Sequence, residues 1–164
     1  MKIYTKTGDN QFTSTILAEN VKKSDLIIEV SGNIDETQSA IMVAYNFVIN
    51  NEVKDLLKNI AEKLFLVGYD IASNKNEISE SDISYLENKI DYFSNILPPL
   101  NSFILPGVSK SSSFLHLART IVRRLERSVV EYTLKNKINR FCLMYLNRLS
   151  DLLFVMARIE ENNE

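Results

Sequence analysis

The sequence lacks tryptophan and has only one cysteine, four glycines and three prolines among its 164 residues. So few chain breakers exclude collagen-like, low-complexity and turn-rich all-β proteins. The single cysteine, Cys142, excludes an internal disulfide and any zinc site built from several cysteines, and we expect it to be inert in the core. The apolar runs are far shorter than the ~20 residues that a membrane span needs, and the polar N-terminus leads into no signal segment. We therefore expect a cytoplasmic protein with no membrane contact.

An excess of charge of one sign is also missing. The chain carries 19 basic and 21 acidic residues, for a formal net charge of -2. Nucleic-acid binding usually needs a basic excess or stripe, so we expect no nucleic-acid partner. The length suits a single domain that spans residues 1–164.

The spacing of apolar residues divides this domain in two. Residues 1–32 show no helical period, and we expect them to form a loop segment, in which residues 26–30 are either a strand or the approach to a helix. From residue 33 to residue 161, apolar residues recur every three or four positions. Long helices with short connections predict an all-α, antiparallel helical bundle. The helices after the first are expected at about 53–72, 80–96, 111–135 and 138–160.

The helix expected at 111–135 carries a line of polar residues beside its apolar stripe. The stripe consists of Leu115, Ala118, Val122, Leu125 and Val129. Steps of 3.6 residues per turn place His116, Arg119, Arg123 and Glu126 along one line, whereas Arg124 points elsewhere. This line is either a solvated face with i,i+3 ion pairs or a polyphosphate site, because guanidinium groups in a row bind phosphate oxygens. A lone helical histidine such as His116 is more often structural than catalytic.

Two further segments are candidates for ligand binding. In the last helix, Asn147, Asp151 and Arg158 form a polar line on an otherwise apolar helix, so they need partners in a helix–helix hydrogen-bond network or in a ligand. Near the N-terminus, residues 5–9 form a polar loop with one glycine, whose lysine and backbone N–H groups could cradle phosphate. This loop matches no P-loop pattern.

Several of these segments together resemble the PduO type of ATP:cob(I)alamin adenosyltransferase, in the family order and nearly the family spacing. The matching stretches are YTKTGD at 4–9 with Thr13 and Lys23, GNIDE at 32–36, FILPG at 103–107, LHLARTIVRRLER at 115–127 and YLNRLSDLLF at 145–154. The last two stretches in tandem are specific to the family. A helical bundle with no ligand would require all these matches to be accidental.

The resemblance implies a five-helix bundle that assembles as a homotrimer, with active sites between neighbouring subunits. The implied reaction moves the 5′-deoxyadenosyl group of ATP to the cobalt of cob(I)alamin and gives adenosylcobalamin and triphosphate. Co(I) is itself the nucleophile, so the protein needs no nucleophilic side chain; it positions C5′ and neutralises the leaving group. The implied ligands are ATP, Mg²⁺ and cobalamin as substrate. The implied protein partners are a reductase and an adenosylcobalamin-dependent enzyme.

The resemblance also implies roles for individual residues. Arg123 would contact the triphosphate, while Glu126 and Asn147 would hold the nucleotide or its magnesium ion. Most of the ligands of that magnesium ion would come from ATP. Arg119 would pair with Asp35 of the neighbouring subunit. Phe103 would press on the lower face of the corrin and displace the axial ligand, leaving a four-coordinate Co(II) that is easier to reduce. The ATP loop would consist of Thr5, Lys6, Thr7, Gly8, Asp9 and Thr13, with Lys23 near the phosphates.

The sequence departs from the family pattern mainly in the ATP loop. Asn10 and Gln11 replace a lysine and a glycine where the backbone is expected to wrap phosphate. Smaller departures are Ile27, Ser31 and Val108. Two functions therefore fit: an active adenosyltransferase with a variant loop, or a paralogue that binds corrinoid or nucleotide without catalysis.

Overall fold

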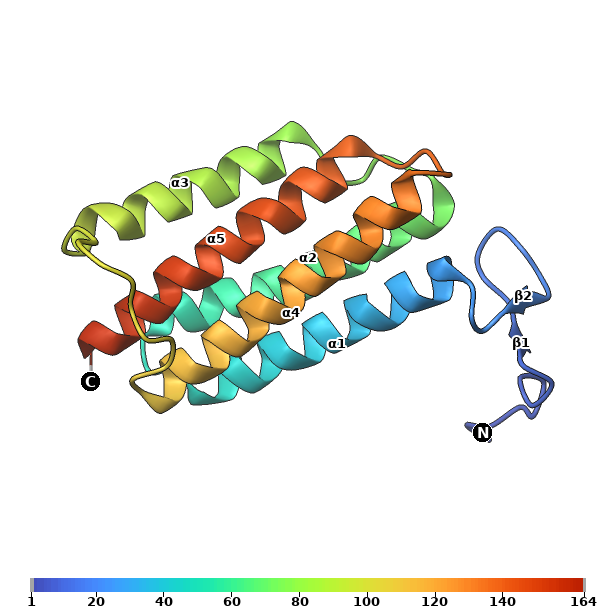
Figure 1. Cartoon of the computed structure of the whole chain (residues 1–164), viewed down its shortest axis with the longest axis horizontal. Coiled ribbons are helices and arrows are strands. Elements are labelled where there is room, and N and C mark those ends of the chain that lie inside the picture. Colours follow the sequence, from blue (N-terminus) through green and yellow to red (C-terminus); the bar gives the residue numbers. More distant parts are fainter. Residues whose placement is uncertain (1, 164) are drawn as a thin grey trace.

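A computed structural model describes residues 2–163 of the chain and contains five long helices (Figure 1). The predicted all-α, five-helix bundle is confirmed. A short antiparallel hairpin precedes the helices and pairs Phe12 with Lys22 and Thr13 with Val21. The elements are β1 (Phe12–Thr13), β2 (Val21–Lys22), α1 (Leu26–Phe47), α2 (Asn51–Ser73), α3 (Glu80–Ile96), α4 (Lys110–Thr133) and α5 (Arg140–Asn163).

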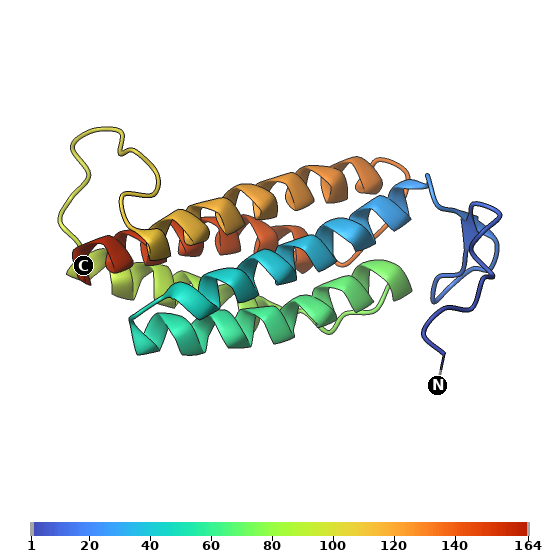
Figure 2. The ribbon, with the colours of Figure 1, turned by 90° about the horizontal axis from the view of Figure 1, so that it is seen from below.

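The helices pack in an order that differs from their order along the chain. Helix α1 contacts α2 on one side and α4 on the other, while α5 contacts both α4 and α3. Consecutive helices run in opposite directions, as predicted, whereas the spatial neighbours α3 and α5 run parallel (Figures 1 and 2). The predicted apolar stripe of α4 lies at the centre of this packing: Leu115, Ala118, Val122, Leu125 and Val129 are all buried.

Helix α1 begins at Leu26, seven residues before the predicted start at residue 33, so the helical part of the chain is longer than predicted. The backbone N–H groups of Ile28 and Glu29 donate to the carbonyl oxygen of Asp25 and begin the helix. Leu26 and Ile27 pack against the core. Their run of consecutive apolar residues carries no period, and the sequence therefore could not separate a strand from a helix here.

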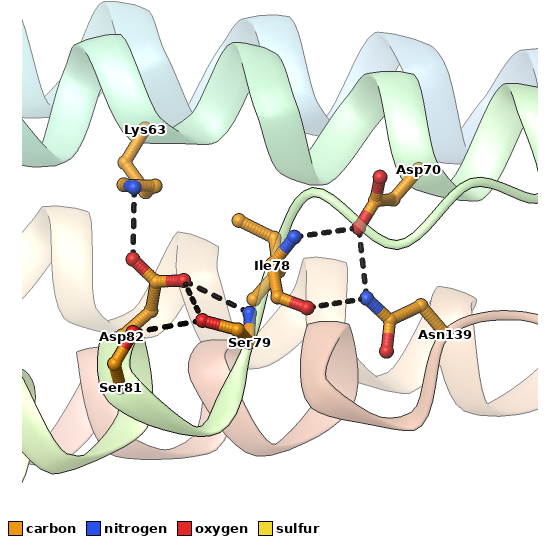
Figure 3. Close-up of polar contacts among 7 residues, drawn as sticks. All are labelled: Lys63, Asp70, Ile78, Ser79, Ser81, Asp82 and Asn139. Atoms are coloured by element: carbon orange, nitrogen blue, oxygen red, sulfur yellow. Dashed lines mark hydrogen bonds and ion pairs between the residues drawn. The ribbon is translucent and has the colours of Figure 1, made fainter.

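A buried carboxylate joins the turn after α2 to the start of α5 (Figure 3). Asp70 is fully buried and accepts hydrogen bonds from the backbone N–H groups of Glu77 and Ile78, at 2.8 and 2.9 Å. Asn139 donates through Nδ2 both to the Asp70 carboxylate, at 2.8 Å, and to the Ile78 carbonyl oxygen, at 2.7 Å. Each of these polar groups thus finds a partner away from water.

The cysteine lies beside this cluster. Cys142 is fully buried, and its Sγ lies 3.8 Å from Oδ2 of Asp70. Burial, together with the nearby Asp70, raises the pKa of the Cys142 thiol to about 12. A thiol with so high a pKa forms almost no thiolate at neutral pH, which agrees with the predicted inert role.

The two ends of the bundle carry different loops (Figures 1 and 2). The N-terminal segment with its hairpin lies beyond the start of α1, at one end. The loop between α3 and α4 lies at the other end, near the C-terminal part of α5. Helix α4 connects the two ends and, with 24 residues, is about 36 Å long. Within residues 2–163, none of the helices has enough apolar sequence to cross a lipid bilayer.

Candidate active site

The N-terminal segment encloses a cavity of about 730 Å³. Its lining includes Gly8, Asp9 and Lys23, three of the residues predicted for the ATP loop, together with Gln11. The Lys23 backbone N–H donates to the Gln11 carbonyl oxygen at 2.9 Å and closes the segment on itself. A Cβ atom at Gly8 would lie 2.9 Å from Nζ of Lys23. The glycine therefore allows the ammonium group to approach the loop backbone closely.

The other predicted loop residues flank this cavity. The hydroxyl groups of Thr5 and Thr7 lie 2.8 Å apart, and the Asp9 backbone N–H donates to the Lys6 carbonyl oxygen at 3.4 Å. Thr13 belongs to β1. The first turn of the segment is thus compact and polar.

Gln11 adopts a backbone conformation that favours glycine. Its φ angle is +69°, in the left-handed region, where residues with a Cβ atom are strained by roughly 1–2 kcal/mol. The family resemblance predicts a glycine at this position. The loop therefore retains the backbone course suited to that glycine even though the residue has changed.

The polar line of α4 brings two guanidinium groups together. Burial, and then the positive charge of Arg123, lowers the pKa of Arg119. Arg123 is exposed, and within residues 2–163 its side chain makes no hydrogen bond or ion pair. Arg124 points away, as predicted, and pairs with Glu36 of α1. Two neighbouring cations without a carboxylate partner form a site suited to an anion such as a phosphate chain.

His116 supports one of these arginines. The side chain is 4% exposed, and its Nδ1 accepts a hydrogen bond from Nε of Arg119 at 3.3 Å. Burial, and then the charge of Arg119, lowers the pKa of His116, although the charge of Glu161 opposes this shift. Because Nδ1 accepts a hydrogen bond, the proton of the neutral ring is on Nε2, which has no partner within the described residues. The expected structural role of His116 thus includes orienting Arg119.

Asn147 makes a helix–helix hydrogen bond, which is one of the two kinds of partner expected for it. Its Nδ2 donates to Oε1 of Glu126 at 3.1 Å, and its Oδ1 accepts from Nη1 of Arg148 at 2.6 Å. Arg148 in turn pairs with Glu87 of α3 at 2.8 Å. This chain of contacts crosses three helices and fixes the Glu126 carboxylate one turn beyond Arg123. Sequence reasoning missed Arg148 and Glu87, because only the packing of α3 on α5 brings them together.

The polar line predicted on α5 is not a single network. Arg158 donates to the carbonyl oxygen of Pro98 in the loop after α3, and Asp151 is exposed. These two residues lie further along α5 and do not reach the Asn147 contacts. Arg158 lies eleven residues, about 16 Å, along α5 from Asn147, so it meets the loop after α3 instead of Glu126.

Two further predicted site residues, Asp35 and Phe103, lie on α1 and in the loop between α3 and α4. Asp35 is exposed on α1, where it lines a second cavity of about 590 Å³ together with Lys58, Glu62 and Phe65. It makes no ion pair with Arg119 within one chain. Phe103 is fully exposed and belongs to the loop between α3 and α4. This loop lies at the opposite end of the bundle from the N-terminal segment (Figure 2). One chain therefore does not bring all the predicted site residues together.

Solved structures and relatives define the class to which this arrangement belongs. The fold matches a variant of the PduO-type ATP:corrinoid adenosyltransferase from Lactobacillus reuteri complexed with cobalamin and ATP, with a TM-score of 0.89 and 34% identity over 96% of this chain and 89% of that one. The corrinoid adenosyltransferase of Bacillus subtilis is 41% identical over 97% of this chain and 86% of its own length. The corrinoid adenosyltransferase PduO of Citrobacter freundii is 37% identical over 99% of this chain. This chain spans only 51% of that relative.

The sequence match along the chain shows to which family it belongs. The family model described as cobalamin adenosyltransferase matches residues 3–160. The chain therefore belongs to the cobalamin adenosyltransferase family. The predicted resemblance to the PduO type is confirmed.

Proposed function

We propose that this chain transfers the 5′-deoxyadenosyl group of ATP to the cobalt of cob(I)alamin and gives adenosylcobalamin and triphosphate. The observation that carries the proposal is Arg123, an exposed cation beside Arg119 that has no carboxylate partner among residues 2–163, in a chain of this family. Liganded relatives of the same fold support ATP and cobalamin as the two substrates.

The proposed chemistry needs electrostatic help rather than a nucleophilic side chain. The electron pair of Co(I) forms the bond to C5′, while the bond between C5′ and the triphosphate oxygen breaks and its electrons leave with the triphosphate. Negative charge therefore grows on the leaving oxygen. Arg123 neutralises that charge, and Lys23 with the loop backbone holds the remaining phosphates. Glu126 and Asn147 orient the nucleotide between them.

Magnesium would accompany the triphosphate in this proposal. Mg²⁺ commonly binds through one or two carboxylates together with substrate phosphates. Glu126 fits this requirement, because only its Oε1 is used by Asn147. Across the described part of the chain, no three carboxylate, histidine or cysteine side chains gather to hold a metal ion by themselves. The residues present thus suit an ion that ATP carries in and Glu126 helps to retain.

We propose that the active site lies between subunits of a homotrimer. Within one chain, Phe103 and the N-terminal cavity lie at opposite ends of the bundle, and the exposed Asp35 has no arginine partner. A neighbouring copy supplies the missing side, with Arg119 pairing with Asp35 across the interface. Light scattering at micromolar protein is expected to give a trimer; a stable monomer would contradict the shared site.

Phe103 completes the proposed site on the cobalamin side. Its exposed ring presses on the lower face of the corrin and displaces the axial ligand, which leaves a four-coordinate Co(II) that a partner reductase can reduce. The product passes to an adenosylcobalamin-dependent enzyme. We place the reaction in the cytoplasm, where the lone Cys142 stays reduced.

A non-catalytic corrinoid- or nucleotide-binding role is the second candidate. It is favoured by the strained Gln11 and by Asn10, which brings no positive charge to the ATP loop. In this alternative the loop would bind the phosphates too weakly for turnover, while the residues on the helices would still bind the corrinoid or the nucleotide.

An anaerobic assay distinguishes the two functions. Chemically reduced cob(I)alamin is mixed with ATP, Mg²⁺ and the protein, and the Co(I) absorption band is followed. If the protein is an adenosyltransferase, the Co(I) band is expected to decay and adenosylcobalamin to appear in proportion to the Co(I) that is lost. Retention of the band, with cobalamin still bound to the protein, would support the binding role instead.

A further inference from the structure

The loop that carries Phe103 is held at its two ends and free in the middle. Residues 97–109 connect α3 to α4 and arch away from the helices (Figure 2). The first part of the arch encloses a cavity of about 350 Å³ against Arg158 and Glu161 of α5. Phe103 is fully exposed, so packing of its own ring does not fix its position.

Two residues near the end of α5 hold the two ends of this arch. The guanidinium of Arg158 donates to the carbonyl oxygen of Pro98, where the loop begins. Oε1 of Glu161 accepts from the backbone N–H of Val108, where the loop ends, at 3.4 Å. The two side chains lie three residues apart on α5, which places them on the same face of the helix.

The second end has a further support at Gly107. Its φ angle is +88°, and its carbonyl oxygen accepts a hydrogen bond from the Ser113 hydroxyl at 3.1 Å. A Cβ at this glycine would lie 2.6 Å from Oγ of Ser113. The backbone therefore turns tightly into α4 at this point, and Glu161 fixes the residue that follows the turn.

We propose that Arg158 and Glu161 are positioning residues for Phe103, a role that rests on the proposed function. By holding Pro98 and Val108 they limit the conformations of the four residues on either side of Phe103 before the substrate arrives. A loop that is already ordered gives up less conformational entropy when its aromatic ring is pressed against a ligand. Losing either contact therefore reduces the fraction of molecules in which the ring displaces the axial ligand.

The experiment compares paired variants at the two contacts. Arg158→Ala and Glu161→Ala remove them, alone and together, whereas Glu161→Gln keeps an acceptor oxygen and Arg158→Lys keeps a donor. Arg140→Ala is the matched control, because it removes an arginine from the same helix at the far end. Thermal unfolding followed by circular dichroism checks that every variant folds.

Three readouts are compared on the full-length variants. The first is hydrogen exchange of backbone amides in residues 97–109. The second is the fraction of cob(II)alamin that becomes four-coordinate when bound with ATP, read from its absorption and electron paramagnetic resonance spectra. The third is adenosylation of chemically pre-reduced cob(I)alamin, in which Co(II) reduction, the step that Phe103 assists, is bypassed.

In the double alanine variant, the backbone amides of this loop are expected to exchange faster and the fraction of four-coordinate Co(II) to fall. Each contact removed is expected to change both quantities by about fivefold, which is the effect of losing one hydrogen bond. Glu161→Gln and Arg158→Lys restore most of the signal, and the rate with cob(I)alamin stays within about twofold of the parent. Unchanged exchange and an unchanged Co(II) spectrum in the double variant overturn the inference. If the parent itself does not adenosylate cob(I)alamin, the proposed function fails, and the exchange data still decide whether these residues hold the loop.

Discussion

Replacing Arg123 by alanine is expected to separate activity from stability. The Arg123 side chain is exposed and, within residues 2–163, makes no hydrogen bond or ion pair. Its charge lies near that of Arg119 and adds to the effect of burial, which lowers the pKa of Arg119 more strongly. Its removal therefore relieves a repulsion in the unliganded protein, so the free energy of unfolding stays unchanged or rises slightly.

The effect on catalysis is expected to be large. A charged donor aimed at a developing anion contributes about 3 kcal/mol to transition-state stabilisation, which corresponds to a loss of about 100-fold in kcat. The assay is the anaerobic decay of the Co(I) band at saturating ATP, with unfolding in urea measured on the same preparations. Saturating ATP separates the loss in kcat from any loss of ground-state binding.

Arg124→Ala is the matched control for this prediction. Arg124 is the next residue on α4, and its pair with Glu36 is about half exposed. Breaking a surface pair of this kind costs about 0.2–1 kcal/mol of stability, and we expect activity to stay within about twofold of the parent. Similar, mild effects of both substitutions on kcat would show that the arginine line is only a solvated face and that Arg123 does not stabilise the leaving group.

Three further predictions concern the loop, the core and the histidine. Asn10→Lys with Gln11→Gly is expected to tighten ATP binding in calorimetry, because the lysine adds charge and the glycine suits the left-handed φ angle. Asp70→Ala leaves two backbone N–H groups without their acceptor and removes one of the two acceptors of the Asn139 amide, so urea unfolding is expected to show a loss of about 3 kcal/mol or more. The pKa of His116 is lowered in the folded protein, so as the pH falls the unfolded chain binds the His116 proton at a higher pH than the folded protein does. Stability is therefore expected to fall as the pH drops below about 6.5, and His116→Phe to remove that slope in pH-dependent urea titrations.

Each of these predictions has an outcome that contradicts it. ATP affinity equal to that of the parent in the double loop variant would mean that the loop is already competent. An Asp70→Ala protein as stable as Asp151→Ala, an exposed position on α5, would mean that the buried cluster contributes nothing. A slope between pH 5 and 6.5 that persists in His116→Phe would assign the acid sensitivity to other groups, since this is the only histidine.

The helices could be predicted where the sequence marks their ends. Helix α3 follows Ser79, whose backbone N–H donates to Asp82 at 2.9 Å, and it ends before Pro98, as expected of these residues. The start of α1 could not be predicted, because its first residues are uniformly apolar. Periodicity reports which face of a helix is buried, and it carries no information where every side chain is apolar.

The candidate site could be predicted only where it follows a single helix. The line from His116 to Glu126 depends on helical spacing alone, and the structure keeps it. The contacts of Asp70 with Asn139 and of Arg158 with Pro98 join residues 69 and 60 positions apart. Such pairs follow from how the helices pack, which spacing within one helix does not encode.

The fate of the ATP shows whether the protein transfers the adenosyl group. Protein, Mg²⁺ and cob(I)alamin are incubated without oxygen with ATP that carries deuterium at C5′, and the products are analysed by phosphorus NMR and mass spectrometry. Adenosyl transfer by displacement at C5′ predicts one intact triphosphate for each adenosylcobalamin, with both deuterium atoms retained on the carbon bound to cobalt. Unchanged ATP, or ADP and phosphate without adenosylcobalamin, would contradict it.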